Sequence, residues 1–149
     1  MQFAVSETGL RTLFVIVAIL SIAGMVVSAV SLQRHCARSA TSYCDFSQNF
    51  NCDIVNRSEY SEIAGIPVAG IGLAGYAVLF LLSAFRKSRA ETPTQLFAAS
   101  LAGFAFALNL TYVEAYQLRT WCILCLASQA VIFVITILSA IIKFRPTSA

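Results

Sequence analysis

Charge is scarce in this chain, and the usual catalytic residue sets are missing. Only 11% of the 149 residues are Asp, Glu, Lys or Arg, while 58% are hydrophobic, which is too apolar for an ordinary soluble domain. The sequence has no phosphate-binding glycine loop, no Ser/His/Asp set and no paired carboxylates within its apolar runs. One histidine, His35, cannot build a metal site, and we expect no nucleic-acid partner. These absences indicate a membrane protein whose chemistry rests on other residues.

Four apolar runs approach or reach the roughly 20 residues that a helix needs to cross a bilayer. The runs are Thr12–Leu32, Ile66–Phe85, Gln95–Tyr116 and Thr120–Ile142. Because an open sheet cannot satisfy its backbone in lipid, we predict an all-α membrane protein with a single domain, residues 1–149, built as a bundle of four transmembrane helices. Val27-Ser28-Ala29 resembles a signal-peptide cleavage site, but the first run is longer than a signal core, so we interpret it as a retained helix.

The distribution of Lys and Arg predicts the orientation in the membrane. Six of these residues lie near helix ends on one side: Arg11, Arg86, Lys87, Arg89, Lys143 and Arg145. Four lie on the other side, in longer loops: Arg34, Arg38, Arg57 and Arg119. The positive-inside rule then predicts a multi-pass protein of the cell inner (plasma) membrane with both termini in the cytoplasm. All five cysteines fall at the outer face, where disulfides form and persist.

Cys122 and Cys125 open the last apolar run, preceded by a tryptophan and separated by Ile-Leu. Residues three apart on a helix share one face, so the two sulfurs can form a bridge or pass electrons on. Thr120 is the expected N-cap, which would place both sulfurs in the first turns, where the helix dipole favours the reactive thiolate. Residues 126–142 carry no charge, so the dithiol lies at the edge of an apolar layer. This position suits chemistry between a water-side partner and a lipid-soluble one.

A second cysteine pair, Cys44 and Cys52, lies in the longest polar segment with seven residues between its members. Such a pair can close a small accessible disulfide, and a dithiol on the same side favours exchange between the two pairs. A structural staple is the alternative. A four-cysteine zinc site fits less well, because zinc knuckles usually have two tight pairs and only Cys122 and Cys125 are close in sequence.

Other polar residues lie in the outer loop and near the end of the third run. Asn56 and Glu59 resemble a capping box, which predicts a short surface helix over Arg57–Ala64 between the first two membrane helices. Asn109 and Glu114 are polar groups at membrane depth, which tend to face the bundle interior and to be functional. For Asn109, an interhelical hydrogen bond and a ligand contact are both open. For Glu114, the alternatives are a ligand contact and a side chain that reaches interfacial water.

The order of these motifs resembles the vitamin K epoxide reductase family, in its bacterial or archaeal branch. The resemblance rests on the loop cysteine pair, on Ser-Glu-Ile-Ala-Gly-Ile-Pro at residues 61–67, and on Trp-Cys-Ile-Leu-Cys at residues 121–125. It covers essentially the whole chain from the first membrane helix to the fourth. The unrelated bacterial four-helix proteins that form disulfides with quinone carry their CxxC in the first outer loop and fit less well. Many bacterial relatives have a fused thioredoxin-like domain, which we do not expect here, so the redox partner would be a separate thioredoxin-like protein outside the cytoplasm.

The resemblance implies a role for each matching cysteine. Cys125 matches the sulfur that faces the quinone, and Cys122 matches the one that exchanges with the loop. Cys52 would attack Cys122, while Cys44 would meet the thiol of the partner. Cys36 has no role in the family scheme, and we interpret it as a packing residue.

The resemblance also bears on quinone binding. Ser61 stands where the family has a polar residue thought to bind the quinone or tune the loop. Gln129 stands where the animal enzymes have a tyrosine, which favours simple quinone reduction over reduction of a vitamin K epoxide. We expect Ser61, Asn109, Glu114 and Gln129 to contact the quinone. The implied function is a thiol oxidase that generates disulfides and reduces ubiquinone, menaquinone or a similar quinone. The alternatives are a membrane scaffold stapled by disulfides and a vitamin K quinone or epoxide reductase.

Overall fold

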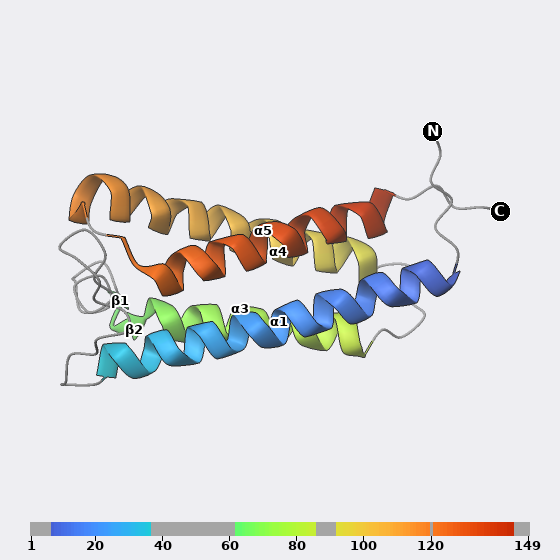
Figure 1. The fold of residues 1–149 in the computed structure, drawn as a ribbon, viewed down its shortest axis with the longest axis horizontal. Coiled ribbons are helices and arrows are strands. Elements are labelled where there is room, and N and C mark those ends of the chain that lie inside the picture. Colours follow the sequence, from blue (N-terminus) through green and yellow to red (C-terminus); the bar gives the residue numbers. More distant parts are fainter. Residues whose placement is uncertain (1–6, 37–61, 86–91, 120, 145–149) are drawn as a thin grey trace.

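The computed structural model describes residues 7–36, 62–85, 92–119 and 121–144. Within these ranges the long helices are α1 (Glu7–Cys36), α3 (Val68–Ala84), α4 (Thr92–Tyr112) and α5 (Ile123–Phe144). The shorter elements are β1 (Glu62–Ile63), β2 (Ile66–Pro67) and a π-helical turn, η2 (Val113–Leu118). Successive long helices run in opposite directions along a common axis (Figure 1). The fold is therefore an antiparallel helical bundle with a small hairpin before α3.

The helices pack in two pairs. α1 lies beside α3, α4 lies beside α5, and α5 also packs against α1 (Figure 1). The first residues of α1 and the last residues of α5 lie at one end of the bundle. The hairpin and the start of α5 lie at the opposite end. Cys122, just before α5, and Cys125, in its first turn, are therefore at the same end of the bundle as the start of α3.

The surface of the bundle is apolar as well as its interior. Within the described residues, three segments are long and apolar enough to cross a bilayer: Thr8–Gln33, Pro93–Leu118 and Ile123–Phe144. α3 is also apolar but has 17 residues. Side chains that point out of the bundle include Ile19, which is 60% exposed, and Val26, which is 57% exposed. Helices that are apolar all round belong in lipid. The predicted all-α membrane bundle is confirmed.

Two helices begin later than the sequence predicts. α3 begins at Val68 rather than Ile66, because Pro67 is its extended N-cap and Ile66 is paired in β2. α5 begins at Ile123 rather than Thr120, which itself lies outside the described residues. The second difference moves Cys122 from the helix into the segment that precedes it.

The hairpin replaces the end of the predicted surface helix. β1 and β2 pair antiparallel, joined by Ala64 and Gly65. These two residues have φ angles of 54° and 81°, in the left-handed region that a right-handed helix does not contain. The helix predicted over 57–64 is therefore wrong for residues 62–64, and its earlier part lies outside the described residues.

A tyrosine joins three helices near the middle of the bundle. Tyr76 of α3 is 4% exposed, and its ring covers Gly24 of α1, where an added Cβ would overlap the ring. The Tyr76 hydroxyl lies 2.8 Å from the backbone oxygen of Ser128 in α5 and 2.8 Å from its side-chain hydroxyl. A buried tyrosine hydroxyl needs such a partner, so this contact fixes α3 relative to both α1 and α5.

Candidate functional site

Cys122 occupies the N-cap position of α5. Its carbonyl accepts the N–H of Leu126 at 2.9 Å, the first hydrogen bond of the helix. Its sulfur accepts the backbone N–H of Cys125, three residues on. This is the usual N-cap arrangement, with a sulfur in place of an oxygen acceptor. The N-cap predicted at Thr120 is wrong, because the helix begins after Cys122.

The two thiols are in contact but differ in burial and charge. Both cysteines are free, and the Cys125 thiol is within hydrogen-bonding contact of the Cys122 sulfur. Cys122 is fully buried, whereas Cys125 is partly exposed. The hydrogen bond from the Cys125 side chain lowers the pKa of Cys122 below its ordinary value, against the opposing effect of burial. Cys122 is thus the sulfur that holds negative charge readily, and the thiolate is the reactive form.

Glu114 lies against both cysteines. It projects from η2, the extension of α4, and is 3% exposed. Its Oε2 accepts the backbone N–H of Cys122 at 3.2 Å. Its carboxylate is also in hydrogen-bonding contact with the Cys125 thiol. The alternative in which Glu114 reaches interfacial water is wrong, because the side chain is buried beside the dithiol. A π-helical turn at such a place is common in functional sites.

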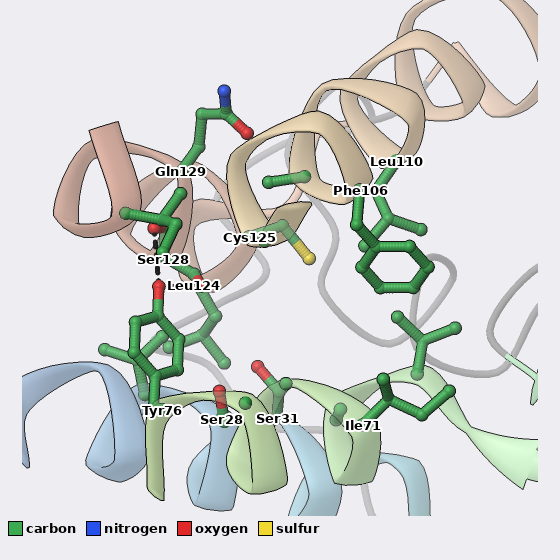
Figure 2. Close-up of a pocket in the computed structure, with 18 of the residues that line it drawn as sticks. Ser28, Ser31, Ile71, Tyr76, Phe106, Leu110, Leu124, Cys125, Ser128 and Gln129 are labelled. Atoms are coloured by element: carbon green, nitrogen blue, oxygen red, sulfur yellow. Dashed lines mark hydrogen bonds between the residues drawn. The ribbon is translucent and has the colours of Figure 1, made fainter. Parts of the chain in front are cut away.

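A cavity of about 390 Å³ lies beside the dithiol and is lined by all four long helices. Its size falls within the range of roughly 300–1,000 Å³ that is usual for small-molecule pockets. Figure 2 shows Phe106 and Leu110 of α4 on one side of the space and Ile71 of α3 on another. The hydroxyls of Ser28 and Ser31, from α1, also line it. The cavity is therefore mainly apolar, with a few polar groups on its wall.

Only one of the two sulfurs belongs to the cavity wall. Cys125 lines the cavity, and Figure 2 shows its side chain directed into that space. Cys122 does not line it; the hydrophobic residues packed against Cys122 are Leu118, Leu124 and Cys125. A ligand in the cavity would meet Cys125, and Cys122 would act on it through the contact between the sulfurs.

Of the two remaining predicted quinone contacts in α4 and α5, one lines the cavity and the other does not. Gln129 lines the cavity, and its Oε1 lies 3.4 Å from the Thr111 hydroxyl of α4. Asn109 is exposed and does not line the cavity. Successive residues of a helix are turned by about 100°, so Leu110 and Thr111 reach the cavity while Asn109 lies on the flank of α4. The structure thus groups Gln129 with the dithiol and separates Asn109 from it.

Some site residues were not predicted, and others cannot be placed. Tyr76 and Ser128 both line the cavity, where their hydrogen bond is visible in Figure 2. A signal was present in the sequence: Tyr76 is the one tyrosine in an apolar run rich in glycine and alanine. The predicted residues that lie outside the described ranges are Cys44, Cys52 and Ser61.

Comparison with known proteins agrees with the resemblance in the sequence. Residues 15–140 match the family model described as the vitamin K epoxide reductase family. The matched range includes most of α1 and α5, all of α3, and the dithiol with Glu114. No curated protein matches the chain. Because the family model covers most of the sequence, the chain belongs to the vitamin K epoxide reductase family, whose members are membrane oxidoreductases that act with quinones.

Proposed function

We propose that this protein is a quinone-dependent thiol oxidase, which generates disulfides and passes the electrons to a membrane quinone. The placement of the dithiol supports this most directly: Cys125 lies on a cavity wall, and Cys122 contacts it from the start of α5. A dithiol that serves only as a structural disulfide does not require a sulfur on a cavity wall. Family membership adds the quinone as the expected acceptor.

The thiol steps are exchanges between pairs of cysteines. A thiolate of the reduced partner attacks Cys44 in the loop disulfide, which frees Cys52 as a thiolate. Cys52 attacks Cys122 in the Cys122–Cys125 disulfide, and Cys125 leaves as a thiolate. The second thiolate of the partner displaces Cys44, so the partner leaves with its own disulfide. Cys44 then attacks Cys52 in the Cys52–Cys122 disulfide, which restores the loop disulfide and releases Cys122. Each step is a thiolate attack through a mixed disulfide, so its rate depends on thiolate fraction and access.

The dithiol is suited to the last step, the transfer of two electrons to the quinone. The hydrogen bond from Cys125 favours the thiolate form of Cys122, which prepares Cys122 to bond to the Cys125 sulfur. The S–S bond then forms as two electrons pass into the cavity. Cys125 meets the acceptor because its side chain lines the cavity.

The cavity fits a flat apolar ring that carries carbonyl oxygens. Gly72 and Gly75 of α3 are part of its wall and leave room for close approach of a ring. Ser31 and Gln129 place donor groups on the wall that could hold the carbonyl oxygens of a quinone. Most other lining residues are apolar, as a polyprenyl-substituted quinone requires.

The orientation and the partner belong to the same proposal. The hairpin and the start of α5 share one end of the bundle, and we place this end outside the cytoplasm because fewer Lys and Arg residues flank it. The thiol partner is then a thioredoxin-like protein of the extracytoplasmic space. Disulfide formation in exported proteins would be the net result.

Turnover with a reduced thioredoxin-like protein and a soluble ubiquinone or menaquinone analogue tests this function. The wild type should consume the oxidised quinone in step with oxidation of the partner, followed by quinone absorbance and thiol titration. Cys125→Ala should reduce turnover to the uncatalysed rate, because the sulfur on the cavity wall is lost. Cys36→Ala is the matched control and should keep wild-type turnover. Wild-type activity in Cys125→Ala, or no consumption of either quinone by the wild type, would overturn the proposal.

A further inference from the structure

Glu114 is a buried acid that the proposed thiol–disulfide exchange steps do not use. An ionised carboxylate at membrane depth is costly unless it is well paired. Within the part of the chain that the structure describes, its partners are the Cys122 backbone N–H and the Cys125 thiol, and no Lys or Arg pairs with it. An uncompensated acid held against a reactive dithiol indicates a role in the chemistry.

Glu114 also faces the cavity. Both Glu114 and Cys125 line it, and their side chains are in hydrogen-bonding contact. The carboxylate therefore has a reacting thiol on one side and the space for a ligand on the other. A proton that leaves Cys125 can reach an oxygen atom in the cavity through this carboxylate without passing through bulk water.

We propose that Glu114 is a catalytic proton carrier, whose carboxylate accepts the proton of Cys125 and delivers it to a carbonyl oxygen of the quinone. This inference rests on the proposed function, because it takes a quinone as the electron acceptor. It adds a reacting group to the dithiol, and gives a reason for an acid at this depth in the bundle.

The protons and electrons balance as follows. The reaction starts from the form in which Cys122 is a thiolate, Cys125 a thiol and Glu114 a carboxylate. Cys125 gives its proton to Glu114, the Cys122–Cys125 bond forms, and two electrons leave the sulfurs for the quinone. The hydroquinone product needs two protons. Glu114 supplies the one from Cys125, and water at the outer end supplies the other, which replaces the proton that Cys122 released on ionising.

Few titratable groups lie against Glu114, so a titration of the dithiol can be interpreted. The titratable groups that the described residues bring against it are Cys122 and Cys125, both from the start of α5. On its own helix, Tyr112 and Tyr116 are 57% and 67% exposed and do not face it. The negative charge of Glu114 raises the pKa of Cys122 and so opposes the effect of the Cys125 hydrogen bond.

Glu114→Gln separates the proton role from a structural one. The glutamine oxygen can still accept the Cys122 N–H that Oε2 accepts now, but the amide cannot take up a proton. Hydroquinone formation by prereduced Glu114→Gln should be slower than wild type by on the order of 100-fold, as for loss of a general acid–base group. Glu114→Ala loses both functions and should be at least as slow. A purely structural role predicts near-wild-type rates in Glu114→Gln.

A second readout needs no quinone. In protein with Cys36, Cys44 and Cys52 replaced by serine, thiolate absorbance reports on the Cys122/Cys125 pair alone. Because Glu114→Gln removes a negative charge next to Cys122, the first thiolate should appear at lower pH than in the same background with Glu114. A more readily formed thiolate combined with slower quinone reduction is the expected signature. A misfolded site would not give this pair of opposite effects.

The outcomes also separate this inference from the proposed function. If the wild type reduces no quinone, the proposed function fails, and the inference fails with it. If the wild type reduces quinone and Glu114→Gln does so at the same rate, only the proton role of Glu114 is overturned. An unchanged thiolate titration in Glu114→Gln would contradict the contact between the carboxylate and the dithiol.

Discussion

The two sulfurs of the site differ because they occupy different positions at the start of one helix. Cys122, as the N-cap, receives the backbone N–H of Cys125 and contacts the Cys125 thiol. Cys125 lies one turn further on and lines the cavity. Helix N-termini favour thiolates, and the N-cap is the position that gains most from the unpaired backbone N–H groups. The position at which α5 begins therefore explains why Cys122 favours the thiolate form and Cys125 faces the cavity.

This asymmetry predicts how a change at Cys125 affects the pH dependence of Cys122. With the other three cysteines replaced by serine, Cys122 is the sole thiol in Cys125→Ala and in Cys125→Ser. Cys125→Ser keeps an O–H donor and should hold the pKa of Cys122 low. Cys125→Ala removes the donor, so Cys122 should ionise at higher pH. Thiolate absorbance against pH measures both midpoints. Equal midpoints would show that the side-chain hydrogen bond does not set the Cys122 pKa.

The sequence predicts the chemistry of single residues where that chemistry depends only on their spacing. The CxxC spacing and the uncharged run after it were enough to mark Cys122 and Cys125 as a dithiol at the edge of an apolar layer. Side-chain direction was not readable to the same degree. Glu114 and Asn109 looked equally suited to face the interior, but only Glu114 is buried. The difference depends on the rotation of α4 and on η2, which no local signal fixes.

At the scale of elements, α1 and α3 approach closely because a residue without a side chain faces a ring. An added Cβ at Gly24 would overlap the Tyr76 ring, whereas a Cβ at Gly70 would meet nothing within 4 Å. The ring cannot move freely, because the Tyr76 hydroxyl is bound to Ser128 in α5. Gly24 is thus needed for packing, and Gly70 is not.

The pair Gly24→Ala and Gly70→Ala tests this contact. Both changes gain helix propensity, by up to about 1 kcal/mol in a helix interior such as that around Gly24, so a lower stability of Gly24→Ala reports the overlap with Tyr76. Gly24→Ala should be less stable than Gly70→Ala by about 1–3 kcal/mol, the usual cost of overpacking. Reversible unfolding in detergent gives the free energies. Equal stabilities would mean that α1 and α3 are not packed as described.

The long helices were predictable as elements, but their starts were not. Sustained apolar runs give a strong and additive signal, so four helices and their order follow from the sequence. Each start depends on a few hydrogen bonds in the preceding segment. Pairing of Ile66 in β2 delays α3, and the capping of α5 by Cys122 delays that helix. A capping-box pattern upstream also suggested a helix up to Ala64, which instead has a positive φ in the hairpin turn.

At the scale of the whole molecule, the chemistry lies at one end. The dithiol, Glu114 and the hairpin are grouped there, and the end of α3 lies at the other. Electrons from a water-soluble partner would enter at this end and leave sideways through the cavity to a lipid-soluble acceptor. The proposed orientation gives this end to the outside of the cell.

Single cysteines at the two ends of α3 test the orientation. Ile63 in the hairpin and Phe85 after α3 are 47% and 71% exposed, so neither replacement disturbs the core. In a background without native cysteines, Ile63→Cys should react with a membrane-impermeant maleimide on intact cells. Phe85→Cys should react only after lysis. The reverse pattern would place the dithiol on the cytoplasmic side and rule out an extracytoplasmic partner.

A single turnover without any thiol partner tests whether Cys125 passes electrons to the quinone. Purified, fully reduced protein is mixed with an equal amount of a soluble quinone, and absorbance is followed while peptide mapping locates the new disulfide. We expect one hydroquinone per protein and a disulfide between Cys122 and Cys125 at the earliest times, both lost in Cys125→Ala. Unchanged quinone, or a first disulfide that does not include Cys125, would contradict the claim that the sulfur on the cavity wall reduces the quinone.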